Sequence, residues 1–436
     1  MASRVRATVL AVVALALAVA KRRHHPASVA WHAPFFSGGG YCSEATAFVL
    51  ALDRAGVHVS IDHHGDSQSG PYVTGLPQET LRALMKMNSR QPKGPVEVAV
   101  CHSEPGAWHV LNGLSWASSP CPVIRRDGLG PSYVVGRTMF ETDRLPDGWP
   151  ERLNAVDEIW VPTEFHKDIF EKAGVRDVHV VGEPVDTTFF NPNGPRYAIE
   201  GVADDVFVVA SVFKWEKRKG WDVLLKAWHA AKLPRGSAAL VLLTNAYHGD
   251  DDFERQADVF VKEQLGDPEG LGALGTVKFL SGLSGEDLAA LYRRADLVAL
   301  PTRGEGWGRP HVEAMASGAA VAATAWSGPT AYLDETNGFP LRWSGPVLVG
   351  DGPFADHMWA EPDAEHLAEI FERARNDPSL CAALGAKARK DMVTHWSPEV
   401  LAKQVVRHLD RIHLTIEGRH KEKGGRRRRY GPGAEL

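Results

Sequence analysis

The chain has 436 residues, of which 44% are hydrophobic and 24% are charged. This is ordinary globular composition, and the length predicts two or three domains that each have their own core. The net charge of -5 argues against a general nucleic-acid-binding protein. Four cysteines are widely scattered without C-x-x-C spacing, so we expect small buried thiols rather than a disulfide framework or a metal site (Cys42, Cys101, Cys121 and Cys381).

Residues 1–28 have the pattern of a leader segment. Arg4 and Arg6 precede an apolar run of 14 residues, 7–20, and a basic cluster follows. The run is short for a bilayer span, which needs about 20 residues, but it suits a secretory signal or an anchor that would associate the protein with a membrane. No acidic residue occurs before Glu44, which also fits an organellar transit peptide, and an unstructured leader is the third alternative.

Strand and helix signals alternate after the leader. The sequences ASVAWHAPF, VHVSID, VEVAVCH, YVVGRTMFE and VDEIWVPT predict strands, and EATAFVLALDRAG predicts a helix after the first of them. This alternation is typical of a parallel sheet covered by helices. We therefore predict that residues 29–185 form an α/β domain.

A boundary follows, because residues 178–195 concentrate prolines and turn signals and read as a linker. The alternation then restarts with DVFVVASV, AALVLLTN, TVKFLSG, DLVALPT and AAVAAT as strands, which predicts a second α/β domain over residues 186–397. The expected fold class is α/β, with two Rossmann-like domains whose parallel sheets face each other across a cleft.

The C-terminus divides into two predicted parts. Ser397 and Pro398 suit the start of a helix, so residues 398–416 are expected to form a long terminal helix. Residues 417–436 include four consecutive arginines and lack apolar periodicity, which predicts a disordered basic tail. Contact of this tail with an anionic membrane is the sharper alternative.

The stretch PTRGEGWGRPHVEAMASG predicts a strand, a glycine loop and a helix. Ligands of open α/β sheets bind past the carboxyl ends of the strands, and a helix N-terminus suits a phosphate. Gly304, Gly306 and Gly308 would let the backbone approach that phosphate closely. Glu313 could then accept two hydrogen bonds from the vicinal hydroxyls of a sugar, with Glu305 facing the group attached to the phosphate. The alternative is a solvated turn residue and an ordinary helix-surface acid.

A second motif, KWEKRKG, places Lys214 at a strand end and Lys219 just before a helix. Two cations in this position could hold a diphosphate from the side opposite the glycine loop. A basic surface loop is the alternative.

Together FKWEKRKGWDVLL, PTRGEGWGRPHVEAMASG and GEPVDTTFFNP resemble the retaining GT-B glycosyltransferases of family 4, also called group 1. The signature of that family is a glutamate, seven residues, a second glutamate and A-M-A-x-G, and Glu305, Glu313 and Gly318 stand at that spacing. The resemblance extends over most of residues 29–415, although SGGGYCSEA and CHSEPGAW in the first half are less specific. It also implies that the terminal helix, residues 398–416, crosses back onto the first domain.

The resemblance implies a role for each matching residue. Glu313 would bind the ribose of a nucleotide-sugar donor, and Glu305 would contact the donor sugar as a catalytic residue. Lys214 and Lys219 would hold the diphosphate, although the family usually has arginine at the first position. The backbone N–H groups of Gly306, Trp307 and Gly308 would contact the phosphate. The first-domain loop of Gly38, Gly39 and Gly40 would face donor and acceptor. Gly282 and Leu283 would line the base.

The implied activity is transfer of a sugar, with retention, from a nucleotide-diphosphate donor (UDP favoured) to an acceptor hydroxyl on a glycan, lipid or small molecule. The leaving phosphate would deprotonate the acceptor, and no metal or other cofactor is expected. A non-catalytic nucleotide-sugar or glycan-binding protein on the same scaffold is the alternative from another class. A GT-B enzyme with other chemistry, an epimerase or a phosphorylase, is a further alternative.

Other motifs fit these expectations less well. The family often has a histidine of the first domain on the donor sugar, but the matching loop here contains Glu141, Thr142 and Asp143. His102 follows a different strand and is a weak substitute. The D-x-D pattern at 250–252 is interpreted as a solvated helix start rather than a metal site. The sequences DHHGD and GGGYCS fit neither a zinc pattern nor a nicotinamide-binding loop.

Overall fold

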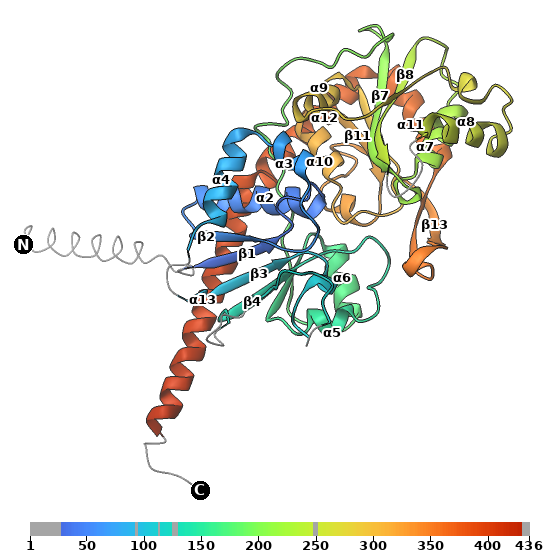
Figure 1. The fold of residues 1–436 in the computed structure, drawn as a ribbon. Coiled ribbons are helices and arrows are strands. Elements are labelled where there is room, and N and C mark those ends of the chain that lie inside the picture. The colour runs from blue at the N-terminus through green and yellow to red at the C-terminus, as the bar shows by residue number, and fades with distance from the viewer. Residues whose placement is uncertain (1–27, 92–94, 112–113, 124–129, 247–251, 430–436) are drawn as a thin grey trace, which may run out of the picture.

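The computed structural model describes residues 28–91, 95–111, 114–123, 130–246 and 252–429 (Figure 1). Two parallel six-stranded sheets form its framework, with strand orders β2-β1-β3-β4-β5-β6 and β12-β11-β10-β7-β8-β9. The predicted α/β class with two Rossmann-like domains is confirmed. The leader and the motif residues Asp250 and Asp251 lie outside the described residues.

The first domain contains strands β1 (Val29–Ala33), β2 (Val59–His63), β3 (Val98–His102), β4 (Tyr133–Arg137), β5 (Glu158–Val161) and β6 (Val178–Val180). Its helices are α2 (Gly40–Arg54), α3 (Gly70–Gly75), α4 (Gln78–Asn88), α5 (Trp149–Leu153) and α6 (Glu164–Lys172), with the 3-10 turn η1 (Pro105–Ala107). Strand β6 lies inside the segment predicted as a linker. Its VHV sequence pairs with β5, so the crossing to the second domain begins only after Val180.

The second sheet consists of β7 (Phe207–Trp215), β8 (Ala238–Ala246), β9 (Thr276–Leu280), β10 (Leu297–Leu300), β11 (Ala320–Thr324) and β12 (Phe339–Leu341). Its helices and turns are η2 (Lys217–Lys219), α7 (Trp221–Ala230), α8 (Phe253–Gln264), η3 (Gly270–Leu274), α9 (Gly285–Arg294), α10 (Arg309–Ala316), η4 (Gly328–Ala331), η5 (Gly352–Phe354), α11 (Ala364–Asn376) and α12 (Pro378–His395). An antiparallel hairpin of β13 (Trp343–Leu348) and β14 (Met358–Pro362) projects from this domain beside the first one (Figure 1).

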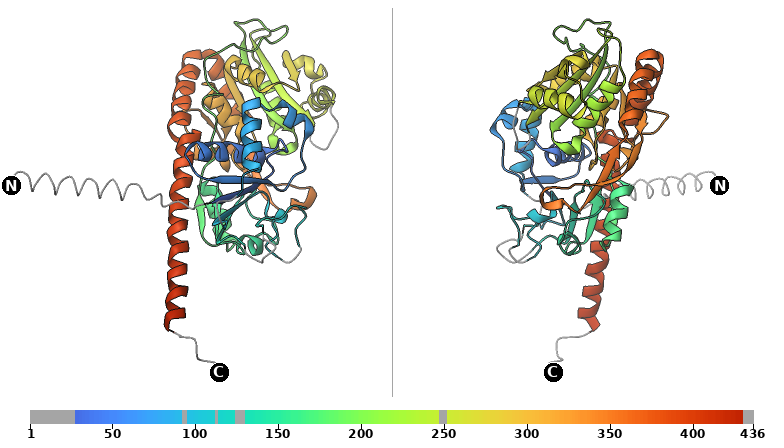
Figure 2. Two further views of the ribbon diagram at one scale, coloured as in Figure 1. Left: turned by 60° about the vertical axis from the view of Figure 1, so that its left-hand side comes forward. Right: turned by 90° about the vertical axis from the view of Figure 1, so that its right-hand side faces the viewer.

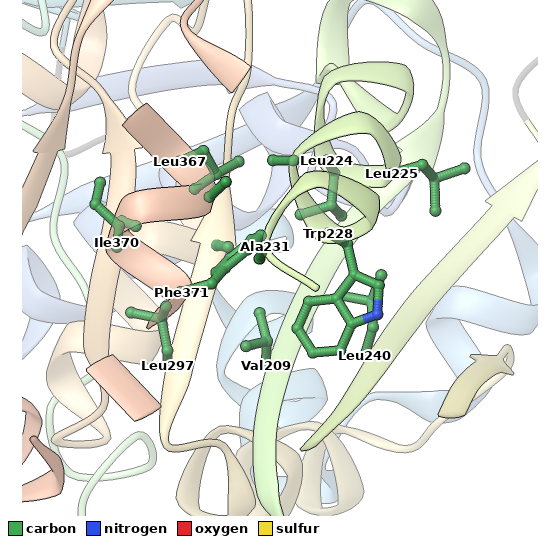
Figure 3. Close-up of a cluster of buried hydrophobic side chains, with 14 of the residues drawn as sticks. Val209, Leu224, Leu225, Trp228, Ala231, Leu240, Leu297, Leu367, Ile370 and Phe371 are labelled. Atoms are coloured by element: carbon green, nitrogen blue, oxygen red, sulfur yellow. The ribbon is translucent and has the colours of Figure 1, made fainter. Parts of the chain in front are cut away.

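Apolar side chains cover both faces of the second sheet. Every residue of β10 and β11 is buried, as parallel strands between two helical layers require. On one face, Trp228 of α7 and Phe371 of α11 pack edge to face with ring centroids 5.4 Å apart, against Val209 and Leu240 of the sheet (Figure 3). This core holds the carboxyl ends of β7 and β10 at one edge of the sheet.

The last helix, α13 (Pro398–Arg429), returns to the first domain. Its apolar residues join the core around β1 and α2, and Arg411 pairs with the buried Glu158 of β5 at 2.7 Å. Figures 1 and 2 show it running along the first sheet and beyond it. The helix continues past residue 416, into the segment expected to be disordered. Straight-chain Glu, Lys and Arg residues favour a helix there, and Glu417 pairs with Lys421 one turn later at 3.8 Å.

The cysteine prediction is wrong for two of the four residues. Cys101 at the end of β3 and Cys121 form a disulfide, with their Cα atoms 5.7 Å apart, while Cys42 and Cys381 are buried free thiols. Tertiary structure brings the pair together over a separation of 20 residues, which no local spacing motif reveals. Among the described helices, none is long and apolar enough to span a membrane.

A fully buried charged network lies behind the first sheet. The Glu44 carboxylate of α2 accepts hydrogen bonds from Arg137 Nε at 2.7 Å and His102 Nε2 at 2.9 Å, and Trp31 donates to His102 Nδ1 at 3.1 Å. Burial raises the pKa of Glu44, but Arg137 and His102 more than offset it, so the pKa is about 2. The network fixes α2, and with it the glycine loop in front of that helix, on the ends of β3 and β4.

Arg137→Leu should therefore lower the free energy of unfolding by about 3–5 kcal/mol, because it leaves the Glu44 carboxylate buried with too little compensation. Urea denaturation at pH 7 measures the change. The control Arg54→Leu removes an exposed ion pair 3.7 Å from Glu399 and should cost little. Equal effects of the two substitutions would contradict the buried-charge account.

Candidate functional site

The glycine loop between β10 and α10 presents Glu305 at the carboxyl edge of the second sheet. The loop is held from behind by Arg303, whose guanidinium donates to both oxygens of Asp222 at 2.8 Å and to Glu361 at 2.8 and 2.9 Å. Arg303 also donates to the Lys217 carbonyl at 2.6 Å, which ties the loop to η2. The backbone that carries Glu305 is thus pre-organised by a buried cation.

The Glu305 side chain is buried, and cationic side chains of the KWEKRKG motif compensate its negative charge. Lys219 Nζ lies 2.8 and 3.0 Å from its two carboxylate oxygens, and Arg218 Nη1 lies 3.5 Å away. Burial raises the pKa of Glu305, but Lys219 and then Arg218 outweigh burial and bring the pKa to about 2. The carboxylate is therefore ionised at neutral pH.

Gly220 explains how η2 comes so close. It is the N-cap of α7 and has a left-handed backbone conformation (φ 68°), and a Cβ there would collide with the Pro301 carbonyl just after β10. Only glycine allows both features. The close approach brings Lys219 across to the glycine loop.

Glu313 lies on α10, two turns behind Glu305. The Tyr292 hydroxyl of α9 donates to it at 3.4 Å, and Arg309 Nε lies 3.7 Å from its other oxygen. Burial raises the pKa of Glu313 to about 6, with Arg309 opposing the shift. Glu313 is thus a carboxylate that titrates near neutrality on a partly buried helix face, rather than an ordinary surface acid.

The other predicted loop residues divide into two kinds. Gly306 and Gly308 are buried, and a Cβ at either would collide with or crowd a neighbour: Met139 at the first, His311 Nδ1 at 2.5 Å at the second. Trp307 is 2% exposed and packs between Tyr332 and Trp396, so its side chain supports the loop rather than facing outward. Lys214 lies exposed at the end of β7, opposite Asn245 of β8 in register. Of the two lysines, Lys219 is the one that lies within hydrogen-bonding distance of Glu305.

Residues from the first domain meet this loop. Glu141 Oε1 lies 3.7 Å from Arg218, and a Cβ on Gly304 would collide with the Glu141 carbonyl. The Thr142 hydroxyl and His357 Nδ1 form a hydrogen bond of 2.7 Å, and Asp143 accepts one from the Met358 N–H at 2.7 Å. The loop after β4 is therefore an interdomain contact as well as the place where a histidine was expected.

The glycine loop of the first domain lies at the start of α2. Gly38 has φ 82° and a Cβ there would contact the Tyr72 ring, Gly39 is the N-cap of α2, and Gly40 begins the helix. Next to it, the Tyr41 hydroxyl and Thr138 are 3.0 Å apart. His102 is fully buried between Trp31 and Glu44, and burial lowers its pKa, so it belongs to the network behind the sheet and does not face the second domain.

The remaining predicted positions are less closely joined to the loop. Gly282 is exposed with φ 66°, and Leu283 packs partly on the core before α9, the helix that carries Tyr292. Asp252 caps α8 by accepting from Arg255 N at 3.1 Å, as expected for a helix start. Among the described residues, no group of three or more His, Cys, Asp or Glu side chains could hold a metal ion.

Sequence reasoning missed three residues of this region. Arg218 was read only as part of a basic loop, yet it contacts Glu305 and Glu141. Arg309 donates to the Pro184 carbonyl at 2.6 Å and lies 4.0 Å from Glu183, both in the connection between the domains. Burial raises the pKa of Glu183 well above its usual range. The GEP sequence beside a predicted domain boundary was the one available signal, and spacing alone assigns it no partner.

The assembled edge can do specific chemistry. The N-terminus of α10 and Lys219 favour an anion, Glu313 can accept paired hydroxyls, and Glu305 can accept further ones. This is a complementary set for a phosphorylated, hydroxyl-rich ligand.

Comparisons with known proteins identify similar chains, and these similar chains are glycosyltransferases. Residues 204–361 match the family model described as "Glycosyl transferases group 1". The D-inositol 3-phosphate glycosyltransferase of Corynebacterium kroppenstedtii is 27% identical over 350 residues, which cover 70% of this chain and 75% of the relative. The enzyme of the same name from Mycolicibacterium smegmatis is 37% identical over 290 residues, 62% of this chain and 61% of the relative.

Two solved structures share the fold. Sucrose-phosphate synthase from Thermosynechococcus elongatus superposes with a TM-score of 0.61 at 18% identity, over 89% of this chain and 100% of that one. Anabaena HepE in complex with UDP and glucose superposes with a TM-score of 0.57 at 16% identity, over 87% and 98%. The fold and the matching relatives define the protein as a glycosyltransferase of the GT-B class. Within that class, residues 204–361 match the group 1 family model, and the relatives that match over most of the chain carry glycosyltransferase names.

The buried Lys219–Glu305 pair predicts a measurable effect on folding. Lys219→Ala should lower the free energy of unfolding by about 1–3 kcal/mol, because Arg218 compensates the remaining carboxylate only in part. The control Lys214→Ala removes an exposed lysine of the same motif and should change stability little. Urea denaturation of both variants checks this, and adding Glu305→Gln to Lys219→Ala should recover part of the loss. A double variant as unstable as the sum of the singles would argue against the pair.

Proposed function

We propose that the protein transfers a sugar, with retention, from a nucleotide-diphosphate donor to an acceptor hydroxyl. The observation that carries this proposal is the buried Lys219–Glu305 pair beside the N-terminus of α10. A cation, a carboxylate and the backbone N–H groups of a helix N-terminus meet there, which suits the junction between a diphosphate and a sugar. UDP is the favoured nucleotide, with support from the UDP complex of the structurally similar HepE.

Each group then has one task. Glu313 accepts hydrogen bonds from the ribose hydroxyls, and Glu305 accepts them from the donor sugar. Lys219, assisted by Lys214 and by backbone N–H groups at Gly306–Gly308, stabilises the negative charge that develops on the leaving diphosphate. Gly282 and Leu283 lie before α9, on the side where the base would be held, while Gly39 and Gly40 face the acceptor from the first domain.

The bond changes balance without a protein nucleophile. The bond between the anomeric carbon and the diphosphate oxygen breaks, and the acceptor oxygen bonds to that carbon on the same face. The acceptor proton passes to the leaving diphosphate. Positioning and charge stabilisation therefore supply the catalysis, and we propose that the cationic side chain of Lys219, rather than a divalent metal, neutralises the leaving diphosphate.

The acceptor is the less defined substrate. The names of the two relatives specify D-inositol 3-phosphate, so a phosphorylated cyclitol is one acceptor class to test on this chain. A non-catalytic nucleotide-sugar-binding protein is the alternative function, and its signature would be tight donor binding without turnover.

We also propose an oxidising compartment for folding, in line with the expected secretory leader. The Cys101–Cys121 disulfide supports this, since such bonds persist mainly outside reducing compartments.

Calorimetry of the protein against UDP, GDP and ADP, with EDTA present, tests the donor site. One nucleotide should bind, and Glu313→Ala should weaken that binding at least about tenfold, or about 1.4 kcal/mol. The control Glu372→Ala, at an exposed position of α11, should leave the binding unchanged. In a separate assay of sugar transfer, Lys219→Ala should reduce the transfer rate to a greater extent than it reduces the folded fraction. Binding only after manganese is added, or unchanged binding in Glu313→Ala, would refute this assignment.

The pKa of Glu313 predicts a pH dependence. Because its pKa is about 6, nucleotide affinity should be highest above that pH and fall as the pH drops through it and the carboxylate gains a proton. The terminal phosphate of a free nucleotide also titrates near pH 6. Glu313→Gln is therefore the control: it keeps the phosphate titration and should flatten the remaining slope. Identical slopes in both proteins would exclude Glu313 as the titrating group.

A further inference from the structure

An exposed tryptophan of the first domain is hydrogen-bonded through its backbone to the turn that follows β3. The Trp116 side chain belongs to a residue that is 53% exposed, in the connection between β3 and β4. Its backbone N–H donates to the Gly106 carbonyl at 3.2 Å, and the neighbouring Ser115 hydroxyl donates to the Ala107 carbonyl at 2.6 Å. The Cys101–Cys121 disulfide closes the segment. The ring is therefore presented to solvent by a pre-organised backbone.

Carboxylates lie beside this ring. The indole N–H of Trp116 donates to the Glu104 carboxylate, and burial raises the pKa of Glu104, with nearby Asp66 adding to the shift. A Cβ on Gly106 would lie 2.6 Å from Glu104 Oε1 and 2.9 Å from Trp116 Nε1, so glycine lets the two groups close over the backbone. We call Asp66, Glu104 and Trp116 the aromatic–acid rim.

An unpartnered imidazole nitrogen belongs to His64, which stands two residues before Asp66. His64 is fully buried, and its Nδ1 bonds to the Ser119 carbonyl at 2.7 Å, which leaves Nε2 as an acceptor without a partner. Burial lowers the pKa of His64 to about 4, so the ring is neutral at pH 7. Buried polar atoms without partners are uncommon and are often found where a ligand or water completes them.

The rim is continuous with the donor site. Asp66 Oδ2 lies 3.9 Å from the position that a Cβ on Gly39 would take. Beyond Gly39, the Tyr41 hydroxyl reaches Thr138 in the loop after β4, and Glu141 of that loop approaches Arg218 beside Glu305. These residues follow the carboxyl ends of adjacent strands, where ligands of parallel sheets bind.

The chemistry of the rim favours one ligand class. An exposed indole ring packs on the C–H face of a sugar ring, and carboxylate oxygens accept hydrogen bonds from its hydroxyls. Two carboxylates repel a phosphate. The cation that interacts with Glu104 is Arg152, and its guanidinium already donates to the carbonyls of Trp108 and Leu114.

We propose that the aromatic–acid rim is the acceptor subsite and binds an uncharged, polyhydroxylated sugar ring rather than a phosphorylated one. The proposal rests on the proposed function and names the acceptor class for it.

The test uses the full chain with UDP bound and measures binding by saturation-transfer NMR. The probes are maltose, methyl α-D-mannoside and myo-inositol as neutral ligands, and myo-inositol 1-phosphate as the charged one. At least one neutral probe should bind about tenfold more tightly than the phosphate. Trp116→Ala should weaken that probe about tenfold and Trp116→Phe should restore most of the binding, whereas Trp343→Ala on β13, another exposed tryptophan, should have no effect. Glu104→Gln should reduce the discrimination against the phosphorylated probe.

Several outcomes would overturn the subsite. The first is tighter binding of the phosphorylated probe than of any neutral one. The second is absence of binding for every neutral probe, or neutral-probe binding that Trp116→Ala leaves unchanged. In a parallel assay with phosphatidylcholine vesicles, a Trp116→Ala variant that loses vesicle binding but keeps sugar binding would also contradict the subsite. UDP affinity, measured in parallel, separates the two proposals. If UDP binds normally and Trp116→Ala does not change the binding of the neutral sugar probe, the rim proposal alone is refuted. If no nucleotide binds, the donor-site proposal is refuted.

Discussion

The ionised carboxylate of Glu305 is the constraint on which the second domain's site depends. A buried negative charge is tolerated only when cations reach it, and here Lys219 and Arg218 arrive from a different strand end. That contact requires Gly220 against the end of β10 and the Arg303 guanidinium behind the loop. The glycine loop, η2 and the hairpin base are therefore one unit, held by charge compensation.

The same loop is also where the two domains meet. Gly304 and Gly306 leave room for the loop after β4, and Arg218 stands between Glu305 and Glu141. Helix α13 joins the domains a second time by packing on the first sheet. A ligand that contacts Glu305 would therefore touch a contact between the domains, so ligand binding there and the arrangement of the domains would depend on the same side chains.

The first domain uses a different strategy from the second. It buries the Arg137–Glu44 ion pair in a sealed network, whereas the connection after β3 carries an exposed aromatic ring beside a carboxylate. The cations of the site come from the second domain. This division of charge is compatible with the proposed roles, in which cations hold a phosphate-bearing donor and carboxylate oxygens accept hydrogen bonds from a neutral, hydroxyl-bearing acceptor.

Local sequence determined the two α/β domains, the loop with Glu305, and Glu313 on the helix after it, because strand periodicity and glycine spacing act over a few residues. It also indicated Lys219, through its position before a helix. Only the tertiary structure decided that Lys219 rather than Lys214 pairs with Glu305, that Arg218 and Arg309 join the site, that His102 is sealed away, and that Cys101 binds Cys121. Each of these depends on which strand ends become neighbours and how deeply a charge is buried, and both are properties of packing between segments far apart in the chain.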